Sequence, residues 1–240
     1  MVLNIGTAGW TIPRDVADRF PAEGSSLSRY AALFPVAEIN SSFHRAHRRS
    51  SWERWRDSVP ASFRFSVKMP KLITHGQKLV GCSDLVDEFL KQAGFLGEKL
   101  AVLLVQLPPK LVFERTVATE FFRLLRFRTG AQIACEPRHP SWFGSEADHL
   151  LEQLAIARVA ADPEICGAAA SPGGSPALRY WRLHGSPVTY RSSYADRIAA
   201  YAFSLRQEEF AGHQVWCIFD NTASSAAASD ALALMQVASG

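Results

Sequence analysis

Three side chains able to do chemistry lie close together in the segment Glu136-Pro137-Arg138-His139. A carboxylate beside a guanidinium is normally ionised, which suits a general base or a metal ligand better than a general acid. Arg138 shares the alternation parity of Glu136, so both side chains should leave an extended chain on the same side. The segment therefore predicts a preorganised Glu136–Arg138 pair. Such a pair serves either a functional site or an ion pair that only stabilises the fold.

Two other residues add to this chemistry. His184 precedes Gly185, where the backbone could approach a ligand closely, although a core histidine bonded to a neighbour explains the pattern equally well. Lys68 could form a Schiff base if it is desolvated, but a salt bridge to Glu38 or Glu136 is the favoured interpretation. We take Glu136, His184 and Lys68 as the catalytic candidates.

A divalent metal is a weaker expectation. Carboxylates together with histidine suit Mn, Mg or Zn. No dense ligand spacing of the kind found in structural metal motifs supports such a site. The candidate ligands are Glu38, Glu136, Asp162, His184 and Asp220.

A strongly basic segment, residues 41–71, is the best clue to a ligand. It holds eight Lys and Arg residues against two acidic ones, Glu53 and Asp57. Trp52 and Trp55 are interleaved with the cations, which could bind phosphates while the aromatic rings stack on bases. The alternative is a solvated helix whose tryptophans pack on the protein. The eight cations are Arg45, Arg48, Arg49, Arg54, Arg56, Arg64, Lys68 and Lys71.

The elements that must position these residues form a regular alternation. Short apolar runs are typical of parallel strands buried on both faces, and most of the segments between them carry helical spacing. Ser50 and Glu53 match a capping box at the start of one such helix. Eight repeats of strand and helix predict one (β/α)₈ TIM barrel over residues 1–240, with an irregular Gly/Pro/Ser-rich loop at 165–177 in place of the sixth helix. The eight runs are 3–6, 36–39, 63–67, 101–105, 131–135, 157–161, 179–183 and 214–219.

Nearly every one of these runs ends in polar residues. In a TIM barrel the carboxyl ends of the strands meet at one mouth, where active sites are built. Any single residue could be structural, but eight polar endings together favour a functional site at this mouth. The expected ligand-binding residues are Trp10, Asn40, His75, Arg138, His139, Arg182, Asn221 and Tyr190.

The composition is that of a globular protein with a sizeable core. Apolar residues make up 48% of the 240 residues, and the formal net charge of +3 only weakly favours anionic partners. No apolar stretch of about 18 residues predicts a membrane helix, and the start of the chain lacks the pattern of a secretory signal. Four cysteines without a CxxC pair, of which Cys135 and Cys217 lie in apolar runs, fit reduced core residues and a cytoplasmic location.

The strand endings form an ordered set of short motifs along the chain. These motifs are IGTAGW at 5–10, EINSSF at 38–43, FSVK at 65–68, TH at 74–75, QLPP at 106–109, EPRHPSW at 136–142, RLHG at 182–185 and FDNT at 219–222. Through them the chain resembles the YecE-like family, domain of unknown function 72, over almost its whole length. The resemblance implies a TIM barrel without an established activity. The chain departs from the family pattern at His44, Pro137 and Asp220, which affects substrate fit more than the main polar positions.

Three functional hypotheses follow. The first is an enzyme acting on a phosphorylated small molecule or a nucleic acid, a metal-assisted phosphoesterase by analogy with other barrels. Glu136 and His184 would then be the acid–base pair, and Arg138 and Arg182 would hold phosphate. The second is a module that binds phosphate or nucleic acid without chemistry. The third is a sugar-type isomerase or lyase that uses Lys68 or the carboxylates.

Overall fold

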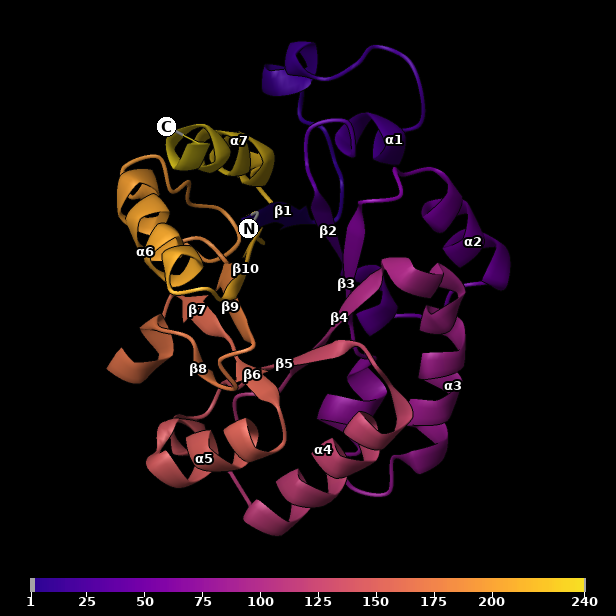
Figure 1. Ribbon diagram of the computed structural model, residues 1–240, viewed down its shortest axis with the longest axis vertical. Helices are drawn as coiled ribbons and strands as arrows, with labels where there is room; N and C mark the ends of the chain where they lie inside the picture. The colour runs from indigo at the N-terminus through magenta and orange to yellow at the C-terminus, as the bar shows by residue number, and fades with distance from the viewer. Residues whose placement is uncertain (1–2, 240) are drawn as a thin grey trace.

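The computed structural model describes residues 3–239, and its strands form one sheet that curves round into a nearly closed barrel (Figure 1). The strand order is β7-β9-β10-β1-β2-β3-β4-β5-β6-β8, and all neighbours are parallel except β6 and β8. The strands are β1 (Asn4–Ala8), β2 (Val36–Ile39), β3 (Arg64–Lys68), β4 (Leu100–Gln106), β5 (Gln132–Glu136), β6 (Ile156–Arg158), β7 (Ala160–Asp162), β8 (Gly173–Gly174), β9 (Leu178–Leu183) and β10 (Gln214–Phe219).

The predicted eightfold barrel is confirmed, and each apolar run coincides with a strand position. The sixth run is divided at Val159 into β6, which pairs with β5, and β7, which pairs with β9, so that this segment closes the ring. The α-helices surround the barrel (Figure 1). They are α1 (Ser26–Tyr30), α2 (Arg49–Asp57), α3 (Ser83–Ala93), α4 (Arg115–Arg128), α5 (Ser145–Gln153), α6 (Ile198–Phe210) and α7 (Ala226–Ser239).

Short helical turns occupy several loops that follow the strands. A π-helical turn, η3 (Leu72–Gly76), follows β3. The 3₁₀ turns are η1 (Arg14–Arg19), η2 (Ser41–Phe43), η4 (Gly94–Lys99), η5 (Pro140–Phe143) and η6 (Gly167–Ala170). Four of these turns (η2, η3, η5 and η6) come shortly after strand ends, where they shape the mouth of the barrel.

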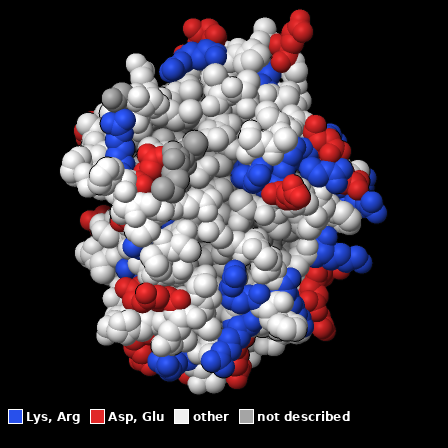
Figure 2. Space-filling model, in the orientation of Figure 1, with Lys and Arg blue, Asp and Glu red and all other residues white. Residues whose placement is uncertain are grey.

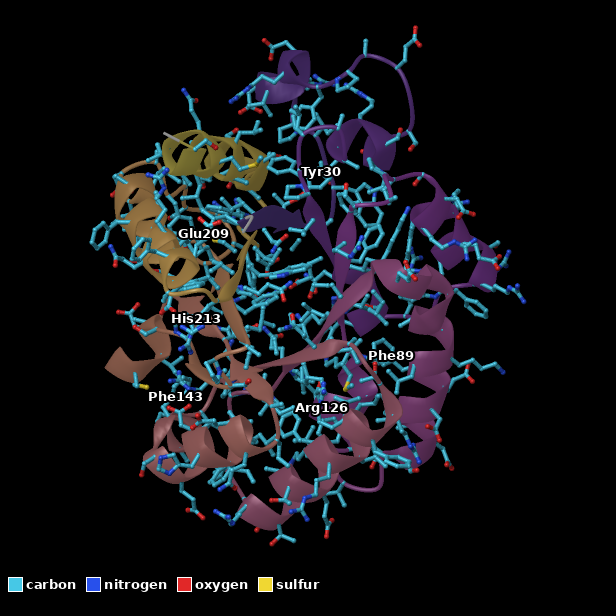
Figure 3. The ribbon with its side chains drawn as sticks, viewed as in Figure 1. Tyr30, Phe89, Arg126, Phe143, Glu209 and His213 are labelled. Atoms are coloured by element: carbon cyan, nitrogen blue, oxygen red, sulfur yellow. The ribbon has the colours of Figure 1, made fainter. Side chains whose placement is uncertain are left out.

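Side-chain alternation divides the core into two layers. Residues on one face of each strand, such as Phe65 and Val67 of β3, pack under the helices. Phe89 of α3 and Tyr30 of α1 meet this layer from the helix side (Figure 3). Residues of the other parity fill the barrel interior, and these are Val36, Val102, Leu104, Ala134, Ala157, Val159, Leu178, Tyr180, Trp216 and Ile218. Continuing this inner parity toward the strand ends determines which polar side chains enter the mouth.

Of two local expectations, one is wrong and the other is confirmed. The capping box at Ser50 is wrong, because α2 begins at Arg49 and its N-cap, Arg48, makes no side-chain cap hydrogen bond. Glu53 instead pairs with Arg49 at 2.7 Å, one helical turn away. The loop at 165–177 is irregular, as predicted, and holds only η6 and β8. It is held by Arg158, whose guanidinium donates to the carbonyl of Ala168 at 2.9 Å.

Close packing between the first two strands requires a glycine. A Cβ atom on Gly6 would lie 2.2 Å from the carbonyl oxygen of Val36, well inside any real contact. Gly6 therefore allows β1 and β2 to approach in register. All four cysteines are free, and Cys135 and Cys217 are buried as expected. Within residues 3–239 no helix is long and apolar enough to cross a membrane.

Candidate functional site

Arg182 occupies the centre of the barrel mouth. It follows the inner parity of β9 and is completely buried. Its guanidinium binds Glu38 through two nitrogens, at 2.7 and 3.0 Å, and binds Glu136 at 2.6 Å. A third carboxylate, Asp220, lies 3.0 Å from Nη2. Arg182 therefore joins the ends of four strands, β2, β5, β9 and β10, at one point.

Two of the carboxylates around Arg182, Glu136 and Asp220, are held in the ionised form. Burial by itself would raise the pKa of Glu136, but Arg138 and Arg182, with His184, outweigh it and hold the pKa well below its usual range. Burial would also raise the pKa of Asp220, but Arg182 and His184 have the larger combined effect and lower it. The same contacts, against the effect of burial, raise the pKa of Arg182. We call these residues, Glu38, Glu136, Arg138, Arg182, His184 and Asp220, the mouth network.

His184 connects two of the carboxylates. Its Nδ1 lies 2.9 Å from Asp220 Oδ2, so this nitrogen carries a proton. Its Nε2 lies 2.9 Å from Glu136 Oε1 and 2.5 Å from Arg138 Nη2. A neutral imidazole accepts from Arg138 at this nitrogen, whereas an imidazolium donates to Glu136. The imidazole is fully buried, so the alternative of a hydrogen-bonded core histidine describes its surroundings well.

Arg138 reaches the rim of the mouth. It forms the predicted ion pair with Glu136, and 17% of its side chain remains exposed. Tyr190 packs edge-on against the His184 ring with centroids 5.8 Å apart, and about half of it is exposed. Gln106 donates to both oxygens of Glu136 at 3.3 Å. Arg138, Tyr190 and Gln106 thus lie against the buried Glu136 and His184 at the rim of the mouth.

Lys68 is buried beside the network without joining it. The salt bridge expected to Glu38 or Glu136 is wrong, since Lys68 has no carboxylate within 4 Å in the described part of the chain. Its ammonium lies over the Phe43 ring, 4.2 Å from the centroid. Burial lowers its pKa, and Arg182 adds to the effect while the nearby carboxylates oppose it.

Phe43 extends this corner toward a predicted ligand-binding residue. The His75 ring packs edge-on against Phe43 at 5.1 Å, and its Nδ1 lies 2.8 Å from the Thr74 hydroxyl. Burial lowers the pKa of His75, and Lys68 and Lys71 lower it further. Lys68 and Lys71 therefore make the potential at this corner positive.

A second opening lies at the ends of β1 and β2. A cavity of about 280 Å³ is lined there by Trp10, Glu38 and Asn40, among other residues. Asn40 Oδ1 is buried and has no hydrogen-bond partner, which is unusual for a buried polar atom. Trp10 packs edge-on against Trp55 at 5.4 Å and also contacts Phe65. Trp10 and Asn40 are thus at the mouth, on the side opposite Arg138 in the strand order.

Two other predicted ligand-binding residues hold loops. The ring of His139 caps η5 by accepting from the backbone N–H of Ser141 at 3.2 Å. Asn221 donates to Asp230 of α7 at 2.6 Å and to the carbonyl of Ser192 at 3.0 Å. Both side chains have structural partners that would keep them from turning toward a ligand.

Asp162 faces away from the mouth. Counting from the inner residues Ala157 and Val159, its parity is outward, and its carboxylate accepts from Tyr194, Arg197 and Tyr201, each at 2.8 Å. Asp162 therefore lies apart from the other four candidate metal ligands, which meet around Arg182 at the mouth. Among the described residues no group of three or more His, Cys, Asp or Glu is arranged to hold a metal ion. Glu38, Glu136 and Asp220 surround a guanidinium instead.

The basic segment is divided in the structure. Arg49 pairs with Glu53 and Arg56 with Asp57, each at 2.7 Å, and basic and acidic side chains alternate over α2 (Figure 2). Trp52 is buried. Trp55 packs edge-on against Trp52 at 5.2 Å. The tryptophans therefore pack on the protein, as in the alternative interpretation.

Two contributors to the mouth were not recognised from the sequence. Tyr180 donates to Glu38 Oε2 at 3.1 Å and lies 2.9 Å from the Ser66 hydroxyl. Tyr180 has the same alternation parity as Arg182 and His184 in β9, so its position inside the barrel could have been predicted from the sequence. Phe43 had no such signal, because it lies in a loop turn.

The fold and this site together define a TIM-barrel protein with a charged network at the carboxyl ends of its strands. The chain belongs to the family described as protein of unknown function DUF72, whose model matches residues 4–240. It is 30% identical to the UPF0759 protein YecE of Escherichia coli K12 over 167 residues, 67% of this chain and 59% of that protein. It is 26% identical to UPF0759 protein YunF of Bacillus subtilis over 149 residues, 59% of this chain and 52% of YunF. The aligned part thus spans less than two thirds of either relative.

Solved structures show the same fold. A DUF72 family protein from Enterococcus faecalis superposes with a TM-score of 0.83 at 19% identity, covering 100% of this chain and 96% of that one. One from Thermotoga maritima gives 0.80 at 22% identity with full coverage of both chains. A fusion protein with a xylose isomerase-like TIM barrel gives 0.53 at 13% identity, over 98% of this chain and 42% of the fusion protein.

Proposed function

We propose that this protein binds a small phosphorylated molecule at the mouth of its barrel, and that Lys68 and Arg138 hold the phosphate. The position of Lys68 carries the proposal. The Lys68 side chain is largely buried, with 6% of the residue exposed, and its ammonium has no carboxylate within 4 Å in the described part of the chain. A charge that is largely withdrawn from water is costly unless it is compensated. A bound anion would supply the missing partner.

Arg138 supports the same proposal. One of its nitrogens, Nη2, contacts Glu136 and His184, and the other donors of the partly exposed guanidinium have no partner among residues 3–239. A guanidinium whose direction is fixed in this way is suited to bidentate contact with phosphate. Glu136 and His184 then serve as positioning residues for Arg138.

Binding is favoured over hydrolysis by the state of Glu136. A general base works best when its pKa lies near the working pH, whereas the arginines lower the pKa of Glu136. Glu136 and His184 are also fully buried under Arg138 and Tyr190, away from any water or substrate. We therefore place the protein with phosphate-binding modules rather than with phosphoesterases.

Calorimetric titration with inorganic phosphate and small sugar phosphates tests the proposal. Lys68→Met keeps the side-chain stem and removes the charge, so the affinity should fall by about ten- to a hundredfold, equivalent to about 1.5–3 kcal/mol. Lys91→Met, at an exposed position of α3, is the matched control and should bind normally. Binding should also weaken as the pH rises through the lowered pKa of Lys68. No binding by the wild type, or equal binding by Lys68→Met, would rule the proposal out.

Lys68 also favours a second candidate, a lyase or isomerase that acts through a Schiff base. Burial lowers the pKa of this amine, which increases the neutral, nucleophilic fraction near neutral pH. The amine would attack a carbonyl carbon and expel water to form an imine. Borohydride reduction with small aldoses and 2-oxo acids, followed by mass spectrometry, should then label Lys68. Absence of label with every carbonyl compound would remove this candidate.

A further inference from the structure

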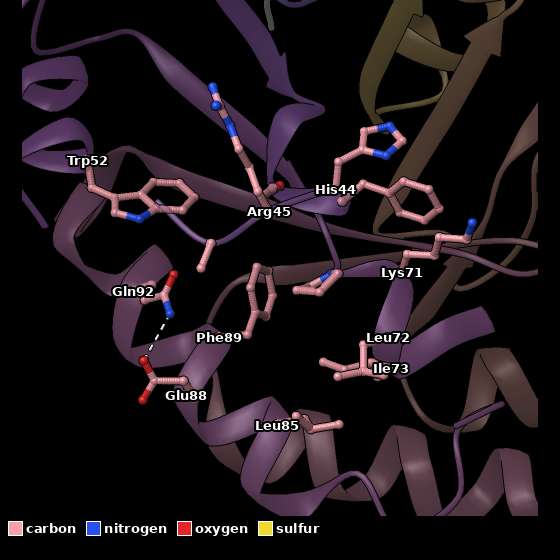
Figure 4. A pocket seen from close by; sticks show the side chains of 14 residues that line it. His44, Arg45, Trp52, Lys71, Leu72, Ile73, Leu85, Glu88, Phe89 and Gln92 are labelled. Carbon is pink, nitrogen blue, oxygen red and sulfur yellow. Dashed lines mark hydrogen bonds between the residues drawn. The ribbon is translucent and has the colours of Figure 1, made fainter. Parts of the chain in front are cut away.

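A separate cavity of about 290 Å³ lies beside the mouth, between α2, α3 and the turns after β2 and β3 (Figure 4). Its volume is near the lower end of the range for small-molecule sites. The lining is mostly apolar and aromatic, with Phe43, Trp52, Leu72, Ile73, Leu85 and Phe89. Such a cavity suits one small ring or a branched chain.

The cavity wall contains a hydrogen-bond donor without an acceptor. Trp52 is 1% exposed, and its Nε1 is buried with no partner. Figure 4 shows the nitrogen edge of the ring on the side of Gln92, across the cavity. Gln92 itself donates to Glu88 at 2.9 Å and does not bond Trp52. Because buried indole N–H groups usually have a partner, an oxygen atom of a ligand would complete this wall.

The rim of the cavity is cationic. Arg45 and Lys71 both line it and are exposed, and neither has a carboxylate within 4 Å in residues 3–239. The acidic residue of the lining, Glu88, accepts the amide of Gln92. The rim therefore favours an anionic group beside the apolar interior.

We propose that this cavity binds a small aromatic carboxylate. The ring would lie between Phe43 and Phe89, a carboxylate oxygen would accept from Trp52 Nε1, and Arg45 and Lys71 would attract the charge. The proposal goes beyond phosphate binding at the mouth and uses different cations. Phe43 belongs to both places, since it lines this cavity and also carries the Lys68 ammonium.

The indole N–H signals in a ¹H–¹⁵N spectrum give a direct readout. The chain has six tryptophans, and the signal absent from Trp52→Phe identifies Trp52. Titration with 3-phenylpropionate should move this signal downfield along a saturable curve. The neutral amide 3-phenylpropanamide keeps the acceptor oxygen and loses the charge, so it should bind about two- to fivefold more weakly. An unmoved Trp52 signal at millimolar 3-phenylpropionate would overturn the proposal.

Substitutions test the location. Ala46 lines the cavity and is exposed, so Ala46→Phe should fill it and abolish the titration without disturbing the core, whereas Ala199→Phe on the surface of α6 should not. Lys71→Ala should weaken binding by about two- to fivefold, and Lys110→Ala, the control, should have no effect. Undiminished binding by a folded Ala46→Phe would show that the carboxylate binds elsewhere, and the proposal would fail.

Discussion

Replacing Glu136 by glutamine tests whether the mouth network holds the barrel together. Glu136 is fully buried, and its oxygens lie 2.6 Å from Arg182 and 2.9 Å from His184. The amide keeps the shape of the side chain but removes the negative charge, and one of its ends is a donor that would face other donors. Removing one partner of a buried ion pair costs about 3–5 kcal/mol, because the other charge is left uncompensated. We expect a loss of this size in the free energy of unfolding.

Urea denaturation at neutral pH measures the loss as a lower midpoint at unchanged slope. Glu208→Gln is the matched control, since Glu208 pairs with Arg179 at 3.1 Å and is 29% exposed. An ion pair as open to solvent as this one contributes about 0–1 kcal/mol. If Glu136→Gln costs no more than the control, Arg182 does not depend on this carboxylate. A small loss of stability together with a loss of phosphate binding would instead show that Glu136 acts mainly by positioning Arg138 for the ligand.

Four further outcomes are expected. Because the pKa values of Glu136 and Asp220 are lowered in the folded protein, the stability they contribute is complete above about pH 5 and is lost as the pH falls through these lowered values. The loss should be about 1.4 kcal/mol per pH unit for each proton bound. Urea denaturation at several pH values measures it, and a stability that does not change with pH would contradict the prediction. Asp162→Asn removes the charge that three donors share and should cost about 2 kcal/mol, seen as a melting temperature lower by roughly 4–8 °C; an unchanged melting temperature would contradict it. Gly6→Ala places a methyl group 2.2 Å from the Val36 carbonyl and should cost about 1–3 kcal/mol by the same assay, with a neutral effect as the contrary result. Labelled oligonucleotides should bind the basic segment only non-specifically, at about 10⁻⁴–10⁻⁶ M and with steep salt dependence, and nanomolar binding in fluorescence anisotropy would show that the packed tryptophans were misjudged.

The barrel could be predicted from the sequence because its signal is repeated eight times. Parallel strands buried on both faces appear as continuous apolar runs, and each of these runs coincides with a strand. The division of the sixth strand at Val159 could not be foreseen, because it arises from closing the ring between β5 and β9. The start of α2 was misplaced because a local capping pattern at Ser50 also occurs inside helices.

The site was predictable where strand alternation decides the direction of a side chain. Glu136, Arg138 and Arg182 meet because each continues the inner parity of its strand. The same alternation places Asp162 on the outer face of its strand, away from the mouth. The sequence prediction placed it among the metal ligands because it considered only that Asp162 ends an apolar run. The partner of Lys68 was beyond reach of the sequence, because Phe43 lies in a turn whose path depends on the packing of η2 and η3.

The cluster around Asp162 also ties the mouth to the outside of the barrel. The carboxylate binds Tyr201 of α6, while the main-chain oxygen of the same residue accepts the amide of His184 at 2.7 Å. The hydroxyl of Tyr194, which also contacts Asp162, accepts a hydrogen bond from the backbone N–H of Gly185 at 2.8 Å. Helix α6, which lies outside the mouth, thus helps to position the His184 imidazole through Tyr201 and Asp162. A substitution on the inner face of α6 that displaces Tyr201 should therefore also disturb the position of His184 at the mouth.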